Sequence, residues 1–565
     1  MANHHPETIT DTNLKSSSSD SPRIGGDFRL REVSIHSKSN PNIVQLNSPG
    51  VFSSLDIFED LFSNVLRGTL AFIDNQGIAE LIPLIGDEDL VISFGTPGSE
   101  GTGTDFEEKK DLTSKDKNEE VSRQIFKIYD CVEAPLEEEG TGKAYVLSFV
   151  SHEYIENSKN KISKGYKQRF YHEVVKDALD KLNTNINPDY HKNSFIEKTG
   201  TSQNVIVPNW TPFQAINFCA SRSTSTAEEE VEIENSAANQ LPVAQGSLFV
   251  FYEKLGTGFF YESIESMIIK QKTNRSIPLY QYTPKSGGGR TSNIELQYFG
   301  VDKFEIKSSF KTLENLGFGM YGSKLIAYDP IRMKYDEVKY DYYEKEESST
   351  SSFVDPKSRA TVETANQSKD DSQRIFANFI ATDIHPTART QNKLISETSD
   401  FLGSNDAHIS LATTTRDHDA MFVPPAPESF GTGATAIIIN PITPIGVSGK
   451  TFKDNEAKPN KIENWLLQRQ AQLQEFDNII VTFTIAGNSS RHVGDLIRFE
   501  VPSSIKPLPP AVGEVGHQLY SGYYLISKIH HRITTTGYET DMEIIKNSFA
   551  KRIPGQKTTV SSDGS

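Results

Sequence analysis

Apolar and polar residues alternate over many short segments of this chain, which predicts β-strands more often than helices. Residues 28–37 and 42–48 alternate on either side of a Lys-Ser-Asn-Pro turn and predict a hairpin. A second hairpin is predicted at 247–264, with its turn at Leu255–Gly258. Further strands are predicted at 65–75, 84–97, 123–134, 143–155, 478–488, 491–502, 520–534 and 540–549.

Helical spacing appears in four places. Ser54 can cap a short helix over 54–64, and Thr211 opens a capping box with Pro212 at the first helical position. Asn460, followed by Glu463, predicts the start of a helix over 460–477. The apolar faces of the first helix, of a helix over 165–183 and of the last helix are, in that order, Leu55, Phe58, Leu61 and Phe62; Tyr166, Phe170, Val174, Ala178 and Leu182; and Ile462, Trp465, Leu466, Leu473 and Phe476.

The order of these elements recurs at the two ends of the chain. The segments LIGDEDLVISFGTP (84–97) and RHVGDLIRFEVP (491–502) each read apolar residue, Gly-Asp, alternating strand and Pro. In both places a helix and a strand precede the Gly-Asp strand, and two strands follow it. This recurrence predicts an internal duplication. The hairpin expected ahead of the second helix is absent locally, and residues 247–264 could supply it from across a long insertion.

The repeated dipeptides, Gly86-Asp87 and Gly494-Asp495, are predicted to be turns that enter equivalent strands. Glycine gives the backbone the freedom that such a turn needs, and aspartate can accept hydrogen bonds from nearby backbone amides. They are the structural site residues that the sequence nominates.

Composition supports a β-rich chain of several domains. The 565 residues carry a net charge of −17, which argues against a sequence-independent grip on nucleic acid, because such a grip needs Lys and Arg against phosphates. No apolar run approaches the roughly 18 residues of a membrane span. The polar ends predict a disordered arm and tail, and the Gly-, Lys- and Glu-rich stretch 98–122 and the acidic stretch 224–240 predict solvated loops.

The motifs that suggest chemistry are each incomplete. Gly449-Lys450-Thr451 resembles a phosphate-binding loop, but Pro444 occupies the position where that loop needs glycine. His530 and His531 would point to opposite faces of a strand, so both cannot bind one metal, and Asp417-His418-Asp419 lacks a second ligand pair. Cys131 and Cys219 each lie in an apolar pattern and are expected to be core residues. We therefore expect no catalytic residues, no cofactor and no metal site.

Several stretches, in order, resemble the central baseplate hub proteins of contractile-tailed bacteriophages. They are VSIHSKSNPNIVQLNSPGVFSSLDIFEDLFSNVLRGTLAFIDNQGIAELIPLIGDEDLVISFGTP, YVLSFVSHEYIENSKNKISKGYKQRFYHEVVKDAL, NVIVPNWTPFQAINFCASRS, SLFVFYEKLGTGFFYESIESM and the closing FTIAGNSSRHVGDLIRFEVP, LYSGYYLISKIHHRIT and YETDMEIIKNSF. The likeness runs from about Phe28 to Phe549. The two loops, residues 346–430 and the chain ends fit less well.

The resemblance implies an α+β, mainly β chain with two tail-tube-type β-barrel domains plus inserted α/β and β-rich domains. The expected division is a disordered arm at 1–27, a first barrel at 28–152 with the loop insertion 98–122, a mixed helical domain at 153–246, a second barrel from 247–275 plus 460–550, an inserted β-rich domain and linker at 276–459, and a disordered tail at 551–565.

The resemblance also implies a homotrimer in the tail baseplate of the virion, assembled in the host cytoplasm. Six similar barrels would form a pseudo-sixfold ring between the hexameric tail tube and the trimeric central spike. The expected partners are the spike, a tail-tube or tube-initiator protein, baseplate wedge proteins and a tape-measure protein. DNA would pass through the ring without specific binding, and an acidic lumen would repel its phosphates.

The sequence leaves two other functions open. One is the hub-like part of a contractile secretion spike, although the chain lacks a short-period Val-Gly repeat for the needle. The other is a tail component that binds or degrades cell-surface glycan, for which the Tyr and Phe residues in 276–430 could line a sugar site. Core packing is the commoner role of such aromatic residues.

Overall fold

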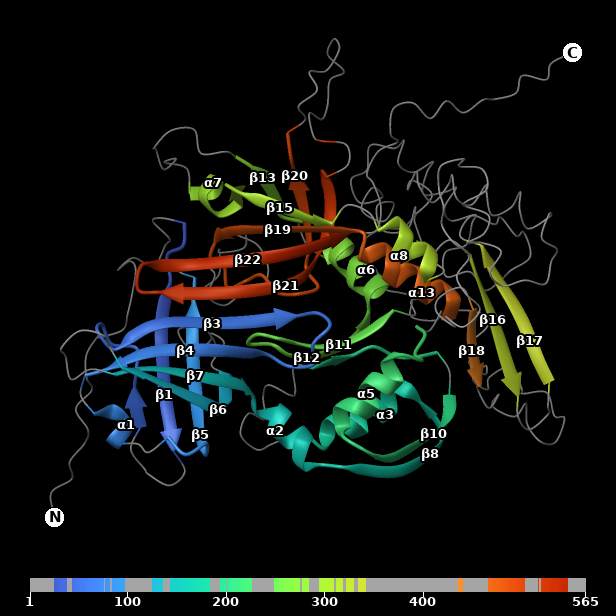
Figure 1. Cartoon of the computed structure of the whole chain (residues 1–565), viewed down its shortest axis with the longest axis horizontal. Coiled ribbons are helices and arrows are strands. Elements are labelled where there is room, and N and C mark those ends of the chain that lie inside the picture. Colours follow the sequence, from blue (N-terminus) through green and yellow to red (C-terminus); the bar gives the residue numbers. More distant parts are fainter. Residues whose placement is uncertain are drawn as a thin grey trace, which may run out of the picture.

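The computed structural model describes residues 25–37, 43–75, 77–81, 84–96, 124–135, 143–182, 194–200, 202–225, 248–274, 277–283, 294–308, 311–318, 322–329, 334–341, 435–439, 466–502, 517 and 520–546. The predictions for the chain ends, the loops at 98–122 and 224–240, most of 342–459, and the Asn460 cap fall wholly or mostly outside these residues. The described chain is mainly β with large antiparallel sheets, as the sequence predicts (Figure 1).

Five strands of the N-terminal part form the first unit. They pair antiparallel in the order β3–β4–β7–β6–β5, and β1 and β2 continue the sheet beyond β5 as the predicted hairpin. Their bounds are β1 Arg29–Ser37, β2 Ile43–Gln45, β3 Phe52–Asp60, β4 Arg67–Asp74, β5 Glu88–Gly95, β6 Gln124–Pro135 and β7 Lys143–Ser151, with the short helix α1 at Ile78–Leu81.

Five strands of the C-terminal part form the second unit, in the antiparallel order β15–β19–β22–β21–β20, with β13 and β14 beyond β20. Their bounds are β13 Leu279–Tyr282, β14 Gly300–Val301, β15 Phe304–Ser308, β19 Ile479–Ala486, β20 Leu496–Glu500, β21 Gly522–Thr534 and β22 Gly537–Lys546. The five strands of each unit therefore share one strand order and one antiparallel sense, whereas the flanking β13 pairs parallel with β20 and β14 and the flanking β1 pairs antiparallel with β5 and β2. Among the described residues neither unit is recorded as a closed barrel.

The segment before β4 is a strand and not the predicted helix. The helix predicted at 54–64 is wrong, because residues 52–60 form strand β3. Leu55 and Ile57 are buried at alternate positions, and β3 lies between β4 and β21. The apolar residues at 55, 58, 61 and 62 also fit helical spacing. Strand partners on both sides override that local signal.

The middle of the chain forms smaller sheets and helices. β8 (Ile162–Phe170) pairs with β10 (Ser202–Trp210); β9 (Phe195–Ile196), β11 (Phe249–Lys254) and β12 (Gly258–Ser263) form a second sheet; and β16 (Gly322–Asp329), β17 (Lys334–Asp341) and β18 (Thr435–Ile439) form a third. The helices are α2 (His152–Lys159), α3 (Tyr171–Asp180), α5 (Pro212–Ala220), α6 (Ile264–Asn274), α7 (Ile294–Phe299), α8 (Thr312–Gly317) and α13 (Leu466–Phe476).

Two predicted helices are confirmed to different extents. In α5, Thr211 Oγ1 accepts the Gln214 amide and Gln214 Oε1 accepts the Thr211 amide, which is the predicted capping box. The helix predicted over 165–183 begins only at Tyr171, because residues up to Phe170 pair as strand β8.

The hairpin β11–β12 was expected to complete the second unit, and this is wrong as a matter of strand pairing. It pairs with β9 instead, and β15 pairs with β19 in the second unit. The two faces of β11 enter different cores. Val250 and Tyr252 pack with β19–β22, whereas Phe249 and Phe251 pack with α3 and α5. The hairpin thus packs the second unit against the helical region without joining its sheet.

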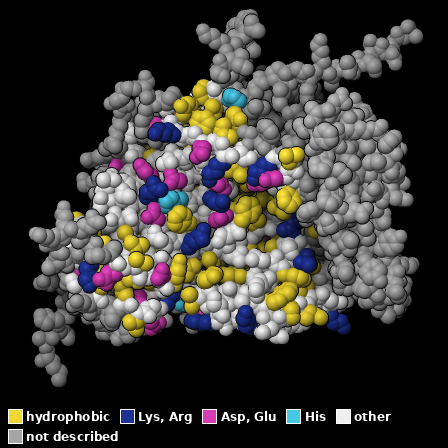
Figure 2. All heavy atoms as spheres, viewed as in Figure 1, with side chains coloured by type: hydrophobic (Ala, Val, Ile, Leu, Met, Phe, Trp, Pro, Cys, Tyr) yellow, Lys and Arg dark blue, Asp and Glu magenta, His cyan; other side chains and the backbone are white. Residues whose placement is uncertain are grey.

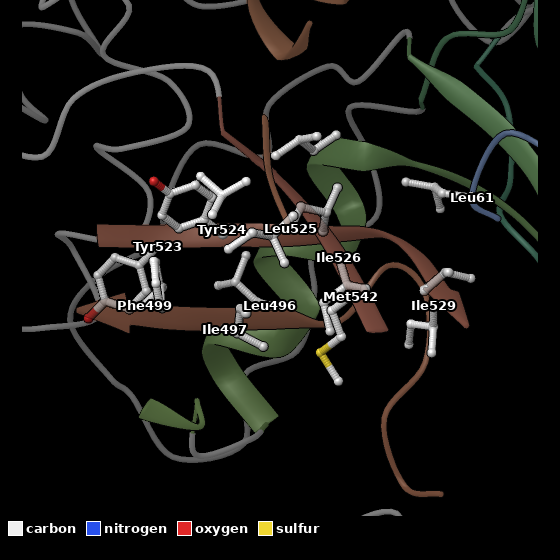
Figure 3. Close-up of a cluster of buried hydrophobic side chains, with 14 of the residues drawn as sticks. Leu61, Leu496, Ile497, Phe499, Tyr523, Tyr524, Leu525, Ile526, Ile529 and Met542 are labelled. Carbon is white, nitrogen blue, oxygen red and sulfur yellow. The ribbon is translucent and has the colours of Figure 1, made fainter. Parts of the chain in front are cut away.

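Among the described residues, three hydrophobic cores follow this arrangement, one in each unit and one in the helical region. Leu61, which follows β3 of the first unit, is buried in the core of the second unit near Ile529 and Met542 (Figure 3). Conversely, Ile533 and Tyr538 of the second unit belong to the core of the first. The cores are therefore interlocked across the boundary between the units.

Candidate functional site

The two units are fused edge to edge, and we call this junction the seam. β3 pairs antiparallel with the second half of β21, from Asp60 opposite Lys528 to Ser54 opposite Thr534. The result is one continuous antiparallel sheet of eight strands, β15–β19–β22–β21–β3–β4–β7–β6, which we call the ladder. Its strands lie roughly one above the next across the molecule (Figure 1).

A buried carboxylate fixes the core side of the seam. Glu59 of β3 has a fully buried side chain, and its Oε1 lies 3.2 Å from His531 Nε2 and 3.3 Å from His492 Nδ1. The Val493 amide donates to its other oxygen at 3.3 Å. Burial alone would raise the pKa of Glu59, but the two histidines outweigh it and hold that pKa well below its usual range. His531 is held in turn by the Tyr538 hydroxyl at 2.7 Å.

The opposite side of the ladder, its open face, carries an ion-pair network centred on His530. The ring lies 2.8 Å from Asp56 Oδ1 and 3.2 Å from Asp541 Oδ2, and it stacks on Phe58 with centroids 4.3 Å apart. Burial would lower the pKa of His530, but its hydrogen bonds to Asp541 and Asp56 raise that pKa to about 9. Protonated His530 thus bridges carboxylates from both units.

The open face as a whole is polar and mixed in charge. Lys and Arg side chains are intermingled with Asp and Glu over β19, β22, β21 and β3 (Figure 2). By strand register its carboxylates outnumber its Lys and Arg side chains. They are Asp56, Asp60, Asp130, Glu305, Glu539, Asp541 and Glu543, against Arg67, Lys307, Lys528 and Arg532. A hollow of about 290 Å³ opens at the seam between Arg67, Lys528 and Glu543.

A second buried carboxylate ties the β11–β12 hairpin to the first unit. Glu253 accepts the Leu66 amide at 2.8 Å, the Ser151 hydroxyl at 2.6 Å and the Gln124 side-chain amide at 3.0 Å. These three donors lie on β6, β7 and the connection before β4. Three donors satisfy a charged group that would otherwise be costly to bury.

The predicted turns enter equivalent strands, but the equivalence is shifted by one residue. Leu90 and Phe126 pair as Ile497 and Tyr524 do, so the strand register aligns Glu88 with Asp495 rather than Asp87 with Asp495. Glu88 accepts the Ile85 amide and Asp495 accepts the His492 amide, three residues back in each case. The carboxylate that closes the first turn is thus Glu88, whereas Asp87 lies 3.5 Å from Lys127.

The two turns also differ in environment. Gly86 (φ +93°) and Gly494 (φ +82°) both adopt the left-handed region that favours glycine. A Cβ at Gly494 would lie 3.0 Å from the Tyr252 hydroxyl, whereas nothing lies within 4 Å of one at Gly86. The second turn is packed under the hairpin, and the first is open.

Sequence reasoning missed Glu59, Asp56 and Glu253. The first two could have been found if residues 52–60 had been assigned as a strand, because Glu59 then continues the inward series after Leu55 and Ile57. His531 does point into the core and His530 to the open face. Among the described residues no cluster of His, Cys, Asp and Glu could hold a metal ion.

The two cysteines have different environments. Cys219 is buried in the core of the helical region, as expected. Cys131 is exposed, so its assignment to a core is wrong for a single chain. The second half of β6, where it lies, has β7 on one side only among the described strands.

No protein-family model matches the chain, and no curated protein matches its sequence. Its structure is similar to a tail protein from Neisseria meningitidis MC58, with a TM-score of 0.40 and 8% identity over 91% of this chain and 96% of that one. It is similar to the 43 kDa tail protein of prophage MuSo2 from Shewanella oneidensis, with a TM-score of 0.39 and 9% identity over 93% and 100%. The E. coli c3393 protein, a component of the type VI secretion system, gives 0.35 and 8% over 93% and 78%.

These similarities are too weak to establish a fold or a function. The function of the chain has to be inferred from its own strand pairing and from its sequence. In the described part of the chain no helix has the length and apolar character to cross a membrane.

Proposed function

We propose that this chain is a structural, non-enzymatic component of a phage tail, and specifically a trimeric baseplate hub. In this role three chains form a ring of six related units that joins a hexameric tail tube to a trimeric spike. The resemblance of the sequence segments to baseplate hub proteins motivates the proposal. The duplicated strand order supports it independently.

The observation that carries the proposal is the fusion of two like units by a head-to-tail contact. The edge strand β3 of the first unit pairs with β21 of the second, and β3 and β21 occupy different places in the shared strand order. A contact between different surfaces of like units generates a ring when its rotation closes, whereas a twofold contact would stop at a pair. One chain therefore already contains one step of a ring.

Two related units in each chain also suit a symmetry mismatch. A sixfold tube and a threefold spike cannot both meet identical surfaces on a ring of six identical subunits. A ring of three chains offers six similar faces to the tube and three equivalent chain-level faces to the spike. The tube, the spike, the wedge proteins and the tape-measure protein are accordingly the partners that we propose, at the tail baseplate of the virion.

The open face of the ladder is the surface that we assign to the lumen. Its side chains are polar, and carboxylates exceed Lys and Arg among its described residues. Such a face would let DNA pass without binding, because phosphates find no continuous basic track.

Sedimentation velocity of the full chain, alone and with the spike protein of the same phage, tests the proposal. We expect a species of three times 63.0 kDa, and electron-microscope projections of a ring with six lobes. A chain that remains monomeric at tens of micromolar in both conditions, or that forms only twofold dimers, would refute the hub. Hydrolysis of purified cell-wall material by the chain would refute the non-enzymatic role.

A further inference from the structure

We infer that β15 of one copy of this chain pairs antiparallel with the second half of β6, residues 129–135, of the next copy. The inference rests on the proposed ring and names the strands and residues that close it. The partner is a second copy of this chain. The template for the contact is the seam within a single chain.

β6 and β21 correspond in their pairing partners and in the position of one β-bulge. Each strand pairs along its first half with the strand after a Gly-Asp turn, β5 or β20. Each then pairs with the following strand, β7 or β22, with a register shift at Tyr129 in one and at Ser527 in the other. Bulges bend a strand and are specific features of a fold, so the same bulge marks the same strand. It aligns Ile128 with Ile526 and Asp130 with Lys528.

The second half of β21 has β22 on one side and β3 on the other. The second half of β6 has β7 on one side, and within the described part of the chain no strand lies on its other side. β15, the counterpart of β3, likewise pairs only with β19 among the described residues. The ladder therefore ends in two edges without a strand partner in the described chain, and these are the two halves of a seam. Unpaired edges of this kind recruit strands from other chains.

Side chains at these edges are exposed in a single chain and occupy positions that are buried at the seam. Cys131 aligns with Ile529, which is 1% exposed in the core. Phe304 and Ile306 align with Leu55 and Ile57, yet they are only partly buried. Pairing the two edges would bury Cys131, Phe304 and Ile306 together, which gives Cys131 the core position that its apolar pattern predicts.

The first Gly-Asp turn gives an independent reason to expect a neighbouring copy at this edge of the first unit. Ile85 aligns with His492 and is 68% exposed. The side chain of His492 is 19% exposed, because Glu59 of β3 reaches across the seam to it. In the ring, the end of the neighbouring β15 takes the place of the end of β3 and faces the Ile85 turn. The exposed Ile85 turn and the edge of β6 thus lie on the same side of the first unit. One neighbouring β15 would cover both.

Transfer of the seam register predicts the pairs residue by residue. Ile57 opposite His531 becomes Ile306 opposite Glu133, and Asp56 opposite Arg532 becomes Glu305 opposite Ala134. Beyond Ile306, β15 has a bulge, and Ser308 lies opposite Ile480 as Phe58 lies opposite Arg67. Ser308 therefore takes the place of Phe58, opposite Val132, and the stem of Lys307 beside it can cover Val132, which is 54% exposed.

A pair of introduced thiols permits a direct test. In the Ile306→Cys/Glu133→Cys double variant, made in a Cys131→Ser background, the two thiols should be opposite each other on adjacent chains, within reach of a disulfide or a two-carbon bis-maleimide. We expect covalent dimers, then covalent trimers and no longer products, on non-reducing gels. The matched control is Glu305→Cys with Glu133→Cys in the same background, because the side chain of Glu305 lies on the other face of the same strand, and neither single variant, Ile306→Cys or Glu133→Cys, should cross-link.

The outcomes separate this inference from the proposed function. Cross-linking of the 306/133 pair that needs both cysteines supports the strand pairing. Particles of trimer mass whose 306/133 pair does not cross-link, or whose 305/133 pair cross-links equally, overturn the pairing and leave the hub in place. Cross-linked ladders longer than trimers support the pairing and overturn the threefold ring. A chain that stays monomeric and uncross-linked overturns both.

Discussion

Glu59 of β3 pairs opposite Ile529 of β21, and its side chain contacts His531, two residues further along β21. Glu59 and His531 are 472 residues apart in sequence, yet Glu59 Oε1 lies 3.2 Å from His531 Nε2 and neither side chain is exposed to solvent. This buried pair joins the two repeats on their core side, while His530 and Asp56 join them on the open face. The chemistry of the seam is therefore asymmetric. The core side excludes water, so each of its polar groups needs a hydrogen-bond partner. The open face is partly exposed to solvent, so the loss of one ion pair there should cost little stability.

The first prediction concerns removal of the buried carboxylate. Glu59→Ala should lower the free energy of unfolding by about 3 to 5 kcal/mol, because it leaves His492, His531 and the Val493 amide without their common acceptor. Urea unfolding followed by tryptophan fluorescence and circular dichroism measures the loss.

The matched control is Asp56→Ala, on the same strand three pairs away and on the open face. Its ion pairs are partly exposed, so we expect a loss of about 1 kcal/mol or less. Equal losses at the two positions would contradict the asymmetry of the seam.

The second prediction is a pH dependence that belongs to His530. Its folded pKa of about 9 lies above its ordinary value of 6.5, so its stabilising effect is complete below pH 6.5 and is lost as the pH rises through 9. After allowance for solvent screening we expect the loss to be about 1 to 2 kcal/mol. The measurement is the unfolding free energy between pH 6 and 10 for the native chain and for His530→Gln.

The difference between the two curves isolates the histidine. Burial lowers the pKa of Lys546 to about 7, and a base with a lowered folded pKa gives the opposite trend, with stability rising between pH 7 and 10.5. This trend is common to both chains and cancels. A difference that does not change between pH 6.5 and 9 would show that His530 is not held by its two carboxylates.

Strands β1, β2, β4 to β7 and β19 to β22 could be predicted from the sequence because their apolar and polar positions alternate, whereas the short strands β13, β14 and β15 were not predicted. In β19, for example, Ile479, Val481, Phe483 and Ile485 are all buried. β3 could not, because Leu55, Phe58 and Leu61 also fit a helix. Its strand form depends on β21, which is supplied from the other end of the chain.

The same limit applies to the candidate site. A Gly-Asp repeat is visible in the sequence, but its true register, Glu88 with Asp495, comes from pairing partners that only the fold reveals. Cys131 shows the reverse case. Its pattern is typical of a buried strand position, whereas in a single chain the side chain is exposed. The inferred pairing between copies would supply the strand that buries it.

The third prediction uses the two turns as a matched pair. Gly494→Ala combines an unfavourable positive φ with a Cβ only 3.0 Å from the Tyr252 hydroxyl, whereas Gly86→Ala has the unfavourable φ alone. We expect losses of about 1 kcal/mol at position 86 and about 2 to 4 kcal/mol at position 494. Thermal and urea unfolding of both variants measure them. Equal losses would show that packing under the hairpin contributes nothing.

The fourth prediction concerns assembly without loss of folding. Ile306→Lys places a charge where β15 should face the core of a neighbouring copy, at the position equivalent to the fully buried Ile57. In a single chain Ile306 is only partly buried, so the variant should fold with a modest loss of stability. We expect it to sediment as a monomer.

Cys131 should then be alkylated at least tenfold faster than in the assembled native chain. Cys219 should stay unreactive in both, because burial raises its thiol pKa to about 12. Glu305→Lys, on the open face of the same strand, is the control that should still assemble. A trimeric Ile306→Lys chain with a protected Cys131 would place the contact between copies elsewhere.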